Sequence, residues 1–396
     1  MGEAAVWRLS LTDAKSVRIT WILWGVLFSA ITCLVLTAER RTVTDAYRGA
    51  ANAWIQGENL YSNTGSGFIY LPQASVLFVP FSILPYTAGE ILWRLVAISS
   101  FVYGIRRITH LAGRDSDTVF FPLVSMMAIP LAWSSARNGQ TTLLMAAMMM
   151  LATANIAYRQ WWRATYWLAL GLALKPLILV IALLVGALYR PMSWRLCVGA
   201  AGVFFFPFLT QSPDYVWQQY TQCITELYSA YELGTERLWA QLFGMLSVAG
   251  LHISSEIQFL VRLIVAISVL VMCWLGQKKL TATQTCIWIY SLATCYLMLF
   301  NPRTENTTYA MLGPVIGLHC AQALLVERRA IQSLAMVLIT IGTVGSYEFG
   351  KMLVPAVYPI WLAPLMCICL TALLIYRTFL EKPDIEQPKL MSQKST

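Results

Sequence analysis

Long apolar runs recur along the whole chain, separated by short polar or basic segments. Most of them approach the ~20 residues that an α-helix needs to cross the hydrocarbon core of a bilayer. The pattern therefore predicts an all-α, polytopic membrane protein. We expect single spans near residues 21–38, 88–105, 118–135, 140–157, 196–210, 257–275, 283–300, 308–325, 331–347 and 356–377.

A further apolar run, residues 166–189, is interrupted at its middle by Lys175-Pro176. Proline removes a backbone donor and clashes with the preceding helical turn, so an unbroken span is not expected there. We predict two short helices, 165–174 and 176–189, which enter and leave the membrane from the cytoplasmic side. With this broken pair counted as two, the prediction is about twelve membrane helices.

Basic residues gather in alternate loops, and the positive-inside rule places such loops in the cytoplasm. Both termini are then cytoplasmic. For the basic loops to fall on one side, residues 72–86 must not cross the membrane. This run is broken by three prolines, and we expect it to form a helix that lies at the outer interface. The basic clusters are Lys15 with Arg18, Arg106 with Arg107, Arg159 with Arg163, Arg190 with Arg195, Lys278 with Lys279, and Arg328 with Arg329.

We expect one integral membrane domain, residues 1–396, without a separate soluble domain. The loops assigned to the outer face hold most of the unexpected polar residues. They are the first external loop, 39–87, the long loop 211–256, the turn at 137–140 and the loop 301–306. Polar residues retained at one membrane face indicate a site on that face.

The composition agrees with a membrane protein. The chain has 396 residues, of which 58% are hydrophobic and 12% charged, and its mean hydropathy is +0.61. Soluble domains carry ~25% charged residues, so lipid is the main solvent here. The formal charge of +9 needs no nucleic-acid partner, because the basic excess falls in the loops assigned to the cytoplasm.

The nine cysteines lack the spacing of a metal site or of a disulfide framework, and we predict no metal and no cofactor. We also predict that the first span is not cleaved.

Residues 42–61 are expected to contain an amphipathic helix that lies along the membrane and ends at Gly57. Its apolar stripe is Tyr47, Ala50, Ala51, Trp54 and Ile55, and its polar face is Asp45, Arg48, Asn52 and Gln56. The position of Asp45 near the helix start has a structural explanation, because Thr42-x-x-Asp45 has the spacing of a capping box. The alternative is a functional carboxylate that faces a water-filled cavity.

The same stretch carries a pattern of an Asp, a Tyr, small residues and Gly-x-x-Leu-Tyr, followed by an aromatic residue, Tyr and Pro. The pattern is formed by Asp45, Tyr47, Gly57, Leu60, Tyr61, Tyr70 and Pro72, and it continues at Pro80, Pro85, Trp93, Asn138-Gly139-Gln140, Lys175-Pro176 and Pro302. This arrangement resembles glycosyltransferase family 87, of the C-type glycosyltransferase superfamily. The resemblance implies the C-type fold and a polyprenyl-phosphate sugar donor, typically of mannose. It also implies that Asp45 is the catalytic base.

Two parts of the chain depart from the family pattern. The late loop, residues 301–308, has no His, where the family commonly has Ser-Pro followed by one or two His. The family's Asn-Gln-Ser-Leu in the long external loop is reduced to Gln241 within residues 239–244. Because both positions help to shape the donor site, the sugar stays open between mannose and another hexose or a pentose.

Transfer from a polyprenyl phosphate needs a base for the acceptor hydroxyl and positive charge for the leaving phosphate. The candidates for binding the donor's phosphate or sugar are Lys175, Arg303, Arg137, Arg94, Asn138, Gln140, Glu305 and Tyr70. Lys175 and Arg94 stand out because an ionisable residue at membrane depth is costly and usually functional. For Arg94 the alternative is snorkelling to the interface; for Arg303 it is a surface ion pair with Glu305.

The sequence therefore predicts a glycosyltransferase of the bacterial inner membrane that works at its outer face. It would move a sugar from a polyprenyl-phosphate donor to a lipid or glycan acceptor, by a single inverting displacement with Asp45 as base. Its partners would be the donor, the acceptor and membrane lipids. A transporter or flippase of lipid-linked sugars and a non-catalytic binding subunit are the alternatives.

Overall fold

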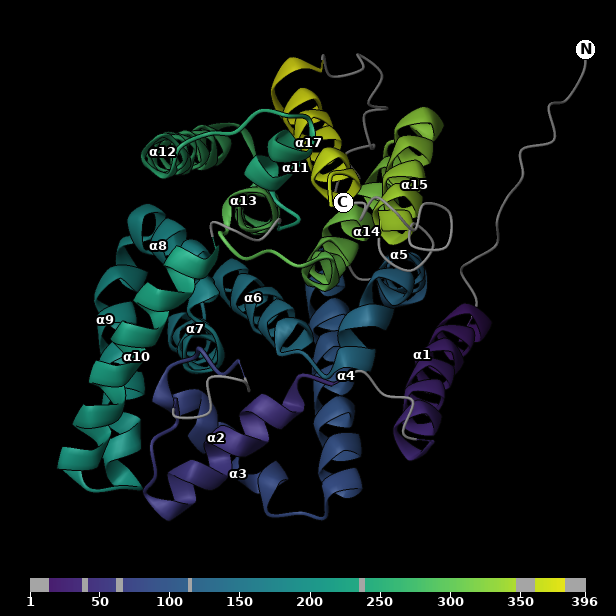
Figure 1. The fold of residues 1–396 in the computed structure, drawn as a ribbon. Helices are drawn as coiled ribbons and strands as arrows, with labels where there is room; N and C mark the ends of the chain where they lie inside the picture. The colour runs from purple at the N-terminus through teal and green to yellow at the C-terminus, as the bar shows by residue number, and fades with distance from the viewer. Residues whose placement is uncertain are drawn as a thin grey trace, which may run out of the picture.

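A computed structural model describes residues 14–37, 42–61, 67–112, 116–234, 239–346 and 360–381, and in these ranges the protein is helical without any strand (Figure 1). The helices are α1 (Ala14–Leu36), α2 (Thr44–Gln56), α3 (Pro72–Ser82), α4 (Tyr86–Thr109), α5 (Ser116–Asn138), α6 (Thr142–Ala157), α7 (Trp161–Leu174), α8 (Leu179–Leu188), α9 (Arg190–Phe205), α10 (Pro213–Gly234), α11 (Leu242–Val248), α12 (Ser255–Lys279), α13 (Ala282–Phe300), α14 (Leu312–Ala321), α15 (Ala330–Val344) and α17 (Leu362–Ile375).

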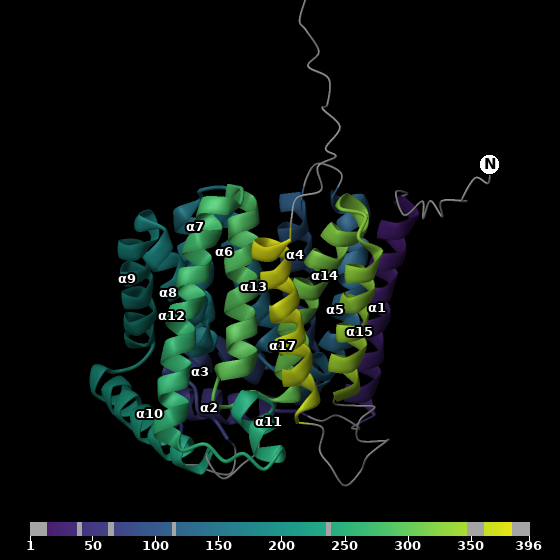
Figure 2. The same ribbon diagram turned by 90° about the horizontal axis from the view of Figure 1, so that it is seen from above.

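The long helices stand side by side, and α2 and α10 lie across one end of this bundle (Figure 2). In the described residues, seven helical segments are long and apolar enough to cross a membrane: 15–36, 86–109, 190–209, 255–279, 282–300, 306–326 and 362–380. The prediction of a multi-pass, all-helical protein is thus confirmed, while the count of about twelve membrane helices stays a prediction. Residues 356–359 of the last expected span lie outside the described ranges.

Burial separates the helices into an inner and an outer group. In α6 nearly every side chain is buried, whereas only 17% of the apolar windows of α9 and α12 is buried. Helix α14 packs tightly on α5, because a Cβ added at Gly313 or Gly317 would lie within 2.8 Å of a backbone atom of Ala128 or Val124. Small residues at such contacts let helices approach closely in the absence of water.

The chain reverses direction at Lys175, as the proline predicts. Lys175 itself is extended, and Pro176 opens a short 3-10 helix that leads into α8. The rings of Trp161 and Tyr189 are 5.9 Å apart, so the beginning of α7 and the end of α8 lie at the same end of the bundle. The predicted broken pair is therefore present as a helical hairpin, and Lys175 is at its tip.

Helix α2 is present, with Asp45 in its first turn and Gly57 at its C-cap in the left-handed region, at φ 72°. Two details of the prediction are wrong. Ile55 is 50% exposed and does not extend the buried stripe. The capping box does not form, because the N-cap is Val43. The Thr42 hydroxyl donates to Glu90 and accepts a hydrogen bond from the Thr44 N–H.

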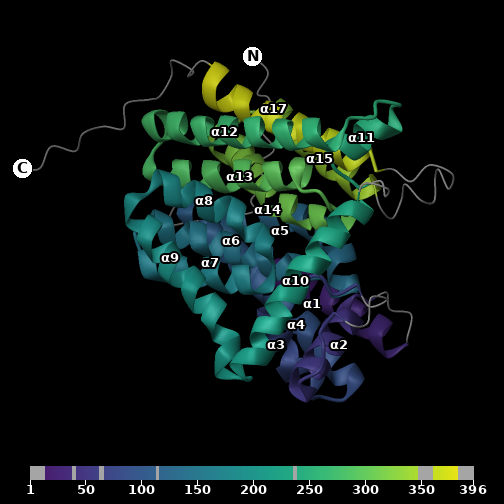
Figure 3. The ribbon, with the colours of Figure 1, turned by 60° about the vertical axis from the view of Figure 1, so that its left-hand side comes forward.

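Two later parts of the chain fix α2 in place. The Arg48 guanidinium donates to the carbonyls of Phe81, Ser82, Leu84 and Tyr86, in the turn between α3 and α4. Helix α10, which spans the end of the bundle between α3 and α11 (Figure 3), closes the other side. The hydrogen bonds from this side are Gln211 Nε2 to the Trp54 carbonyl at 2.6 Å, Tyr215 OH to the Glu58 carbonyl at 2.6 Å, and Leu60 N–H to Gln219 Oε1 at 3.0 Å.

Candidate functional site

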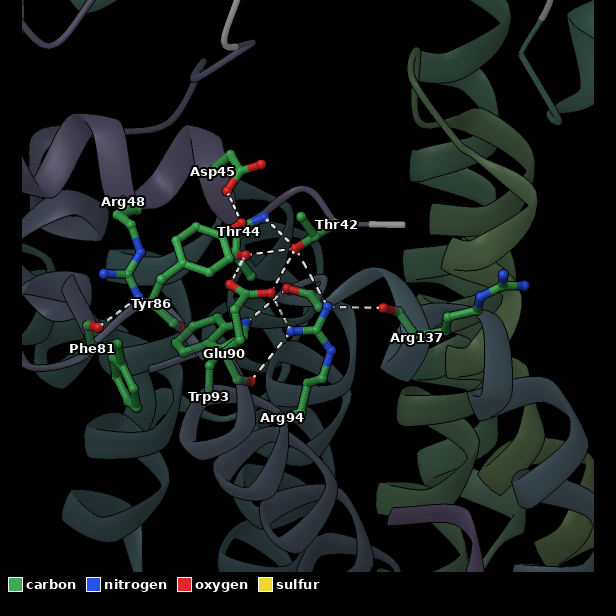
Figure 4. A network of polar contacts seen from close by, with 11 residues as sticks. Thr42, Thr44, Asp45, Arg48, Phe81, Tyr86, Glu90, Trp93, Arg94 and Arg137 are labelled. Carbon is green, nitrogen blue, oxygen red and sulfur yellow. Dashed lines mark hydrogen bonds and ion pairs between the residues drawn. The ribbon is translucent and has the colours of Figure 1, made fainter. Parts of the chain in front are cut away.

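A buried ion pair lies beneath the start of α2, and we call it and its hydroxyl partners the closed cluster: Thr42, Thr44, Glu90 and Arg94 (Figure 4). Arg94 Nη1 is 2.6 Å from Glu90 Oε2, and the two side chains are 1% and 0% exposed. Thr42 Oγ1 donates to the same carboxylate at 3.0 Å, and Thr44 Oγ1 donates to Oε1. Each charged group therefore has protein partners on the inside of the molecule.

This arrangement corrects the expectation that Arg94 binds the donor phosphate. Its Nη2 donates to the carbonyl of Arg137 at 2.9 Å, and almost none of its surface is accessible. Burial of an ion pair is costly unless the partners are well bonded. Here the Glu90 carboxylate accepts three hydrogen bonds and both Nη atoms of Arg94 donate, whereas its Nε has no partner among the described residues. Neither a donor ligand nor snorkelling to the interface is compatible with a side chain enclosed on all sides. In this structure Arg94 is buried and paired with Glu90.

The turn at 137–140 is shaped to fit against the closed cluster. Gly139 has φ +65°, and a Cβ there would lie 2.7 Å from Thr44 Cγ2 and 3.2 Å from Arg94 Cζ. Its carbonyl accepts the Trp93 indole N–H at 2.7 Å, and the Asn138 carbonyl accepts the Val43 N–H at 3.0 Å. Asn138 thus joins α2 to α5 through its backbone. The Arg137 side chain extends away from the cluster (Figure 4).

Asp45 lies at the outer edge of the closed cluster and is exposed. Its Oδ1 accepts a hydrogen bond from the phenol of Tyr86, the first residue of α4 (Figure 4). The Tyr86 ring is held in turn by Arg48, whose Cζ is 4.9 Å from the ring centroid. A solvent-accessible carboxylate is therefore fixed by one neutral donor.

A second group of polar residues, the open cluster, consists of Tyr70, Gln140, Lys175, Glu305 and Thr307. Gln140 Nε2 donates to Glu305 Oε2 at 2.6 Å, and Thr307 Oγ1 is 2.9 Å from Gln140 Oε1 and 3.2 Å from Glu305 Oε2. Glu305 is exposed, and Gln140 and Lys175 are half-buried. The fold thus brings together side chains from the start of α6 and from the loop after α13.

Tyr47 connects the two sides of the open cluster. Its ring stacks on Tyr70 at 5.2 Å, and Lys175 Nζ is 5.8 Å from the centroid of the Tyr70 ring. Burial raises the pKa of Tyr47 well above its ordinary value, and the nearby Tyr70 and Glu305 also raise it. The phenol therefore stays neutral, and it lies 3.4 Å from Thr141 Oγ1. The cation at the hairpin tip and the carboxylate of the late loop face a shared aromatic wall.

Arg303 lies beside this group, on the late loop. Its Cζ is 5.6 Å from the centroid of the Trp239 ring, and the next carbonyl, of Thr304, accepts the Ala240 N–H at 2.8 Å. Gln241 caps α11, because its side chain accepts the Phe243 N–H at 3.0 Å. The residual match to the family's Asn-Gln-Ser-Leu is therefore the N-cap of a helix within residues 211–256.

Sequence reasoning missed Glu90, Tyr86 and Thr307. Glu90 and Arg94 are four residues apart in an apolar helix, a spacing that allows an ion pair and that could have identified Arg94 as half of one. Tyr86 and Thr307 carry no such local signal. Among the described residues, no three His, Cys, Asp or Glu side chains lie together in a way that could hold a metal ion.

Comparison with known proteins gives one match. The model of glycosyltransferase family 87 matches residues 68–302, which include Tyr70, Gln140 and Lys175 but neither Asp45 nor Glu305. No curated protein and no solved structure matches the chain. The matched segment covers more than half of the chain, so the protein belongs to glycosyltransferase family 87 and is a membrane glycosyltransferase.

Proposed function

We propose that the protein transfers a sugar, mannose or another hexose or pentose, from a polyprenyl-phosphate donor to a lipid or glycan acceptor. Family membership supports sugar transfer. The observation that carries the rest is the open cluster, in which Lys175 lies over the Tyr70 ring, Tyr70 stacks on Tyr47, and Gln140 is bonded to Glu305. This combination suits a sugar bearing a phosphate.

Asp45 is the base in this proposal. It is exposed, it occupies the first turn of α2, and Tyr86 holds its Oδ1. We assign the other oxygen to the acceptor hydroxyl. The hydroxyl oxygen attacks the anomeric carbon while its proton passes to Asp45. The bond from that carbon to the donor phosphate breaks, and its electron pair leaves with polyprenyl phosphate. One carboxylate suffices for such an inverting displacement, whereas retention would need a second one as nucleophile.

Lys175 is the proposed ligand of the donor phosphate. It is half-buried at the tip of the α7–α8 hairpin, beside Tyr70, and a partly desolvated cation stabilises the negative charge that grows on the leaving oxygen. Tyr70 offers a ring face to the sugar, and Gln140 and Glu305 are placed to bind its hydroxyls. Arg303 and Arg137 remain candidates for additional phosphate contacts, and Asn138 for a sugar contact.

The proposed location is the outer face of a bacterial inner membrane, with both chain termini in the cytoplasm. The support is charge: Arg107 and Arg163 lie at the opposite end of α4 and α7 from Tyr86 and Lys175. In a background without native cysteines, Glu305→Cys should react with an impermeant thiol reagent from outside, and Arg328→Cys only from inside. Labelling of both from one side would contradict this orientation.

The assay for the function uses purified protein in detergent with polyprenyl-phosphate mannose and related donors. The measurement is the release of polyprenyl phosphate and the formation of a glycosylated acceptor. Release that requires acceptor supports transfer. A flippase would move labelled donor across liposomes without release, and a binding subunit would retain donor without either product.

A further inference from the structure

A cavity of about 420 Å³ lies far from the proposed active site. It is lined by α4, α6 and α7, near the end of α4 and the beginning of α7, and it is open on one side. Tyr86 at the other end of α4 contacts Asp45, and Lys175 follows the other end of α7. The cavity therefore opens at the opposite end of the bundle from α2.

Two arginines line this cavity, and among the residues that the structure describes no carboxylate does. Arg107 belongs to the last turn of α4 and is half-buried, and Arg163 belongs to the first turn of α7 and is exposed. Arg163 Nη1 donates to the neutral side chain of Gln160 at 3.2 Å. Two like charges that face the same cavity repel each other unless an anion lies between them.

Aromatic rings line the cavity below the arginines, and Trp162 lies beside Arg163 at the rim. Tyr103 precedes Arg107 by one helical turn, and Tyr166 follows Arg163 by one turn, so both tyrosines lie deeper than the arginines by roughly 5 Å. The exposed fractions of Tyr103 and Tyr166 are 51% and 58%, which leaves their rings facing the surroundings of the bundle. Cations at the rim with aromatic rings below them match the order of head group and acyl chain in a lipid.

The third wall, from α6, repeats this order. Asn155 is 4% exposed and its Nδ2 donates to the Leu151 carbonyl at 2.7 Å, one turn deeper. The α6 wall is therefore polar beside the arginines and apolar beside the tyrosines, and the Asn155 amide already donates to a carbonyl of its own helix. Neither a sugar nor a metal ion is favoured by such a lining, whereas an amphipathic anion is.

We propose that this cavity binds the phosphate head group of an anionic phospholipid. The phosphate lies between Arg107 and Arg163, because guanidinium groups bind phosphate oxygens through paired hydrogen bonds. The acyl chains leave the cavity past Tyr103 and Tyr166. The shared chemistry, a phosphate, could also come from a free anion, so the test separates the two sources.

The experiment is native mass spectrometry of the detergent-purified full-length protein titrated with phosphatidylglycerol. The double variant Arg107→Gln/Arg163→Gln should lose affinity by about 10- to 30-fold, since each basic residue near a membrane surface contributes about a tenfold or smaller factor. The matched control is Arg159→Gln, which removes an exposed charge from the α6–α7 connection outside the cavity and should bind as the parent does.

Three outcomes would overturn the proposal. The double variant could retain phosphatidylglycerol as well as the parent. Phosphatidylcholine of the same chain length could bind equally, which would remove the need for the anionic charge. Inorganic phosphate at the same concentration could displace the lipid, which would leave a free-anion site. Arg163→Gln alone, at an exposed position, supplies the test if the double variant does not fold, with at least a threefold loss expected. Sugar transfer at the other end does not enter these measurements.

Discussion

The closed and open clusters are built from similar groups, and both lie beneath α2, yet they differ in access. Glu90 and Arg94 are 0% and 1% exposed and neutralise each other at 2.6 Å. Glu305 is exposed and is bonded by a neutral amide, and Lys175 faces an aromatic ring. The two clusters thus differ in what their charges can do. A charge that is paired inside a sealed site supports the fold, and an accessible charge with neutral neighbours is available to a ligand.

The largest expected effect follows from Asp45→Asn. Asparagine preserves the size and accepts the Tyr86 hydrogen bond through its carbonyl, but it cannot take the acceptor's proton. We expect the transfer rate to fall by about 10²–10⁴-fold with unchanged thermal stability and donor affinity. The measurement is initial rate with saturating donor. Glu58→Gln, an exposed acid just after α2, is the matched control and should keep full activity. A fully active Asp45→Asn protein would reduce Asp45 to a favourable charge at a helix N-terminus.

Next in size is the loss of the buried pair. Arg94→Met leaves Glu90 without its charged partner, and breaking a buried pair in this way costs about 3–5 kcal/mol. We expect a marked drop in melting temperature, monitored by differential scanning fluorimetry in detergent. The double variant Glu90→Gln/Arg94→Met should lose less than Arg94→Met alone, because no unpaired carboxylate remains.

One outcome would contradict the difference in access between the two clusters. If Arg94→Met had the melting temperature of the parent but lost donor binding, the closed cluster would have to be open to ligands.

Lys175→Ala should have an intermediate effect. Removal of a charged hydrogen-bond donor to the phosphate is expected to weaken donor binding by about 10- to 100-fold, from a loss of about 1.5–3 kcal/mol. Lys175→Arg should recover part of it. Donor affinity can be measured by microscale thermophoresis with a fluorescent polyprenyl-phosphate sugar. Lys278→Ala, a basic residue near the end of α12, is the control and should bind normally. Equal affinity in Lys175→Ala and the parent would make Lys175 a residue of the hairpin turn only.

The smallest effect is predicted for Tyr86→Phe, which removes the hydroxyl that holds Asp45 Oδ1. A neutral hydrogen bond contributes about 0.5–1.5 kcal/mol, so the rate should fall by roughly 2- to 10-fold. Donor affinity should stay constant, since the phenol contacts the base and not the phosphate. The same fold loss in donor affinity as in rate would place Tyr86 in the donor site instead.

Local patterns predicted the parts of this fold that depend on local physics. The buried stripe of α2 follows from helical periodicity, its end follows from the freedom of Gly57 at positive φ, and the hairpin tip follows from Pro176. The same kind of reasoning failed at Thr42, whose spacing to Asp45 fits a capping box but whose hydroxyl is used by Glu90. A short pattern cannot weigh a competing partner from another helix.

The sequence could predict which residues belong to the candidate site, but not which of them contact one another. Asp45, Gln140, Lys175 and Glu305 were identified one by one, but the contact between Gln140 and Glu305 joins residues that are 165 positions apart. Periodicity and spacing carry no information at that range. For Arg94 the sequence indicated a charge within an apolar helix, but it did not show that the side chain is enclosed. The enclosure depends on the turn at Gly139 and on the hydroxyl of Thr44, which are far from Arg94 in the sequence.

The bonds between α2 and α10 have a consequence for biosynthesis. Gln211 follows Trp54, whose carbonyl it binds, by 157 residues. At a translation speed of about 5–20 residues per second, the ribosome adds that length in roughly 8–30 s. Helix α2 is therefore synthesised long before residues 211–219, which bind its C-terminal end, and Glu305 is made later still. Until then the contacts of Arg48 with the turn between α3 and α4 are the ones that can hold α2, so the proposed site is completed only when the last third of the chain is being made.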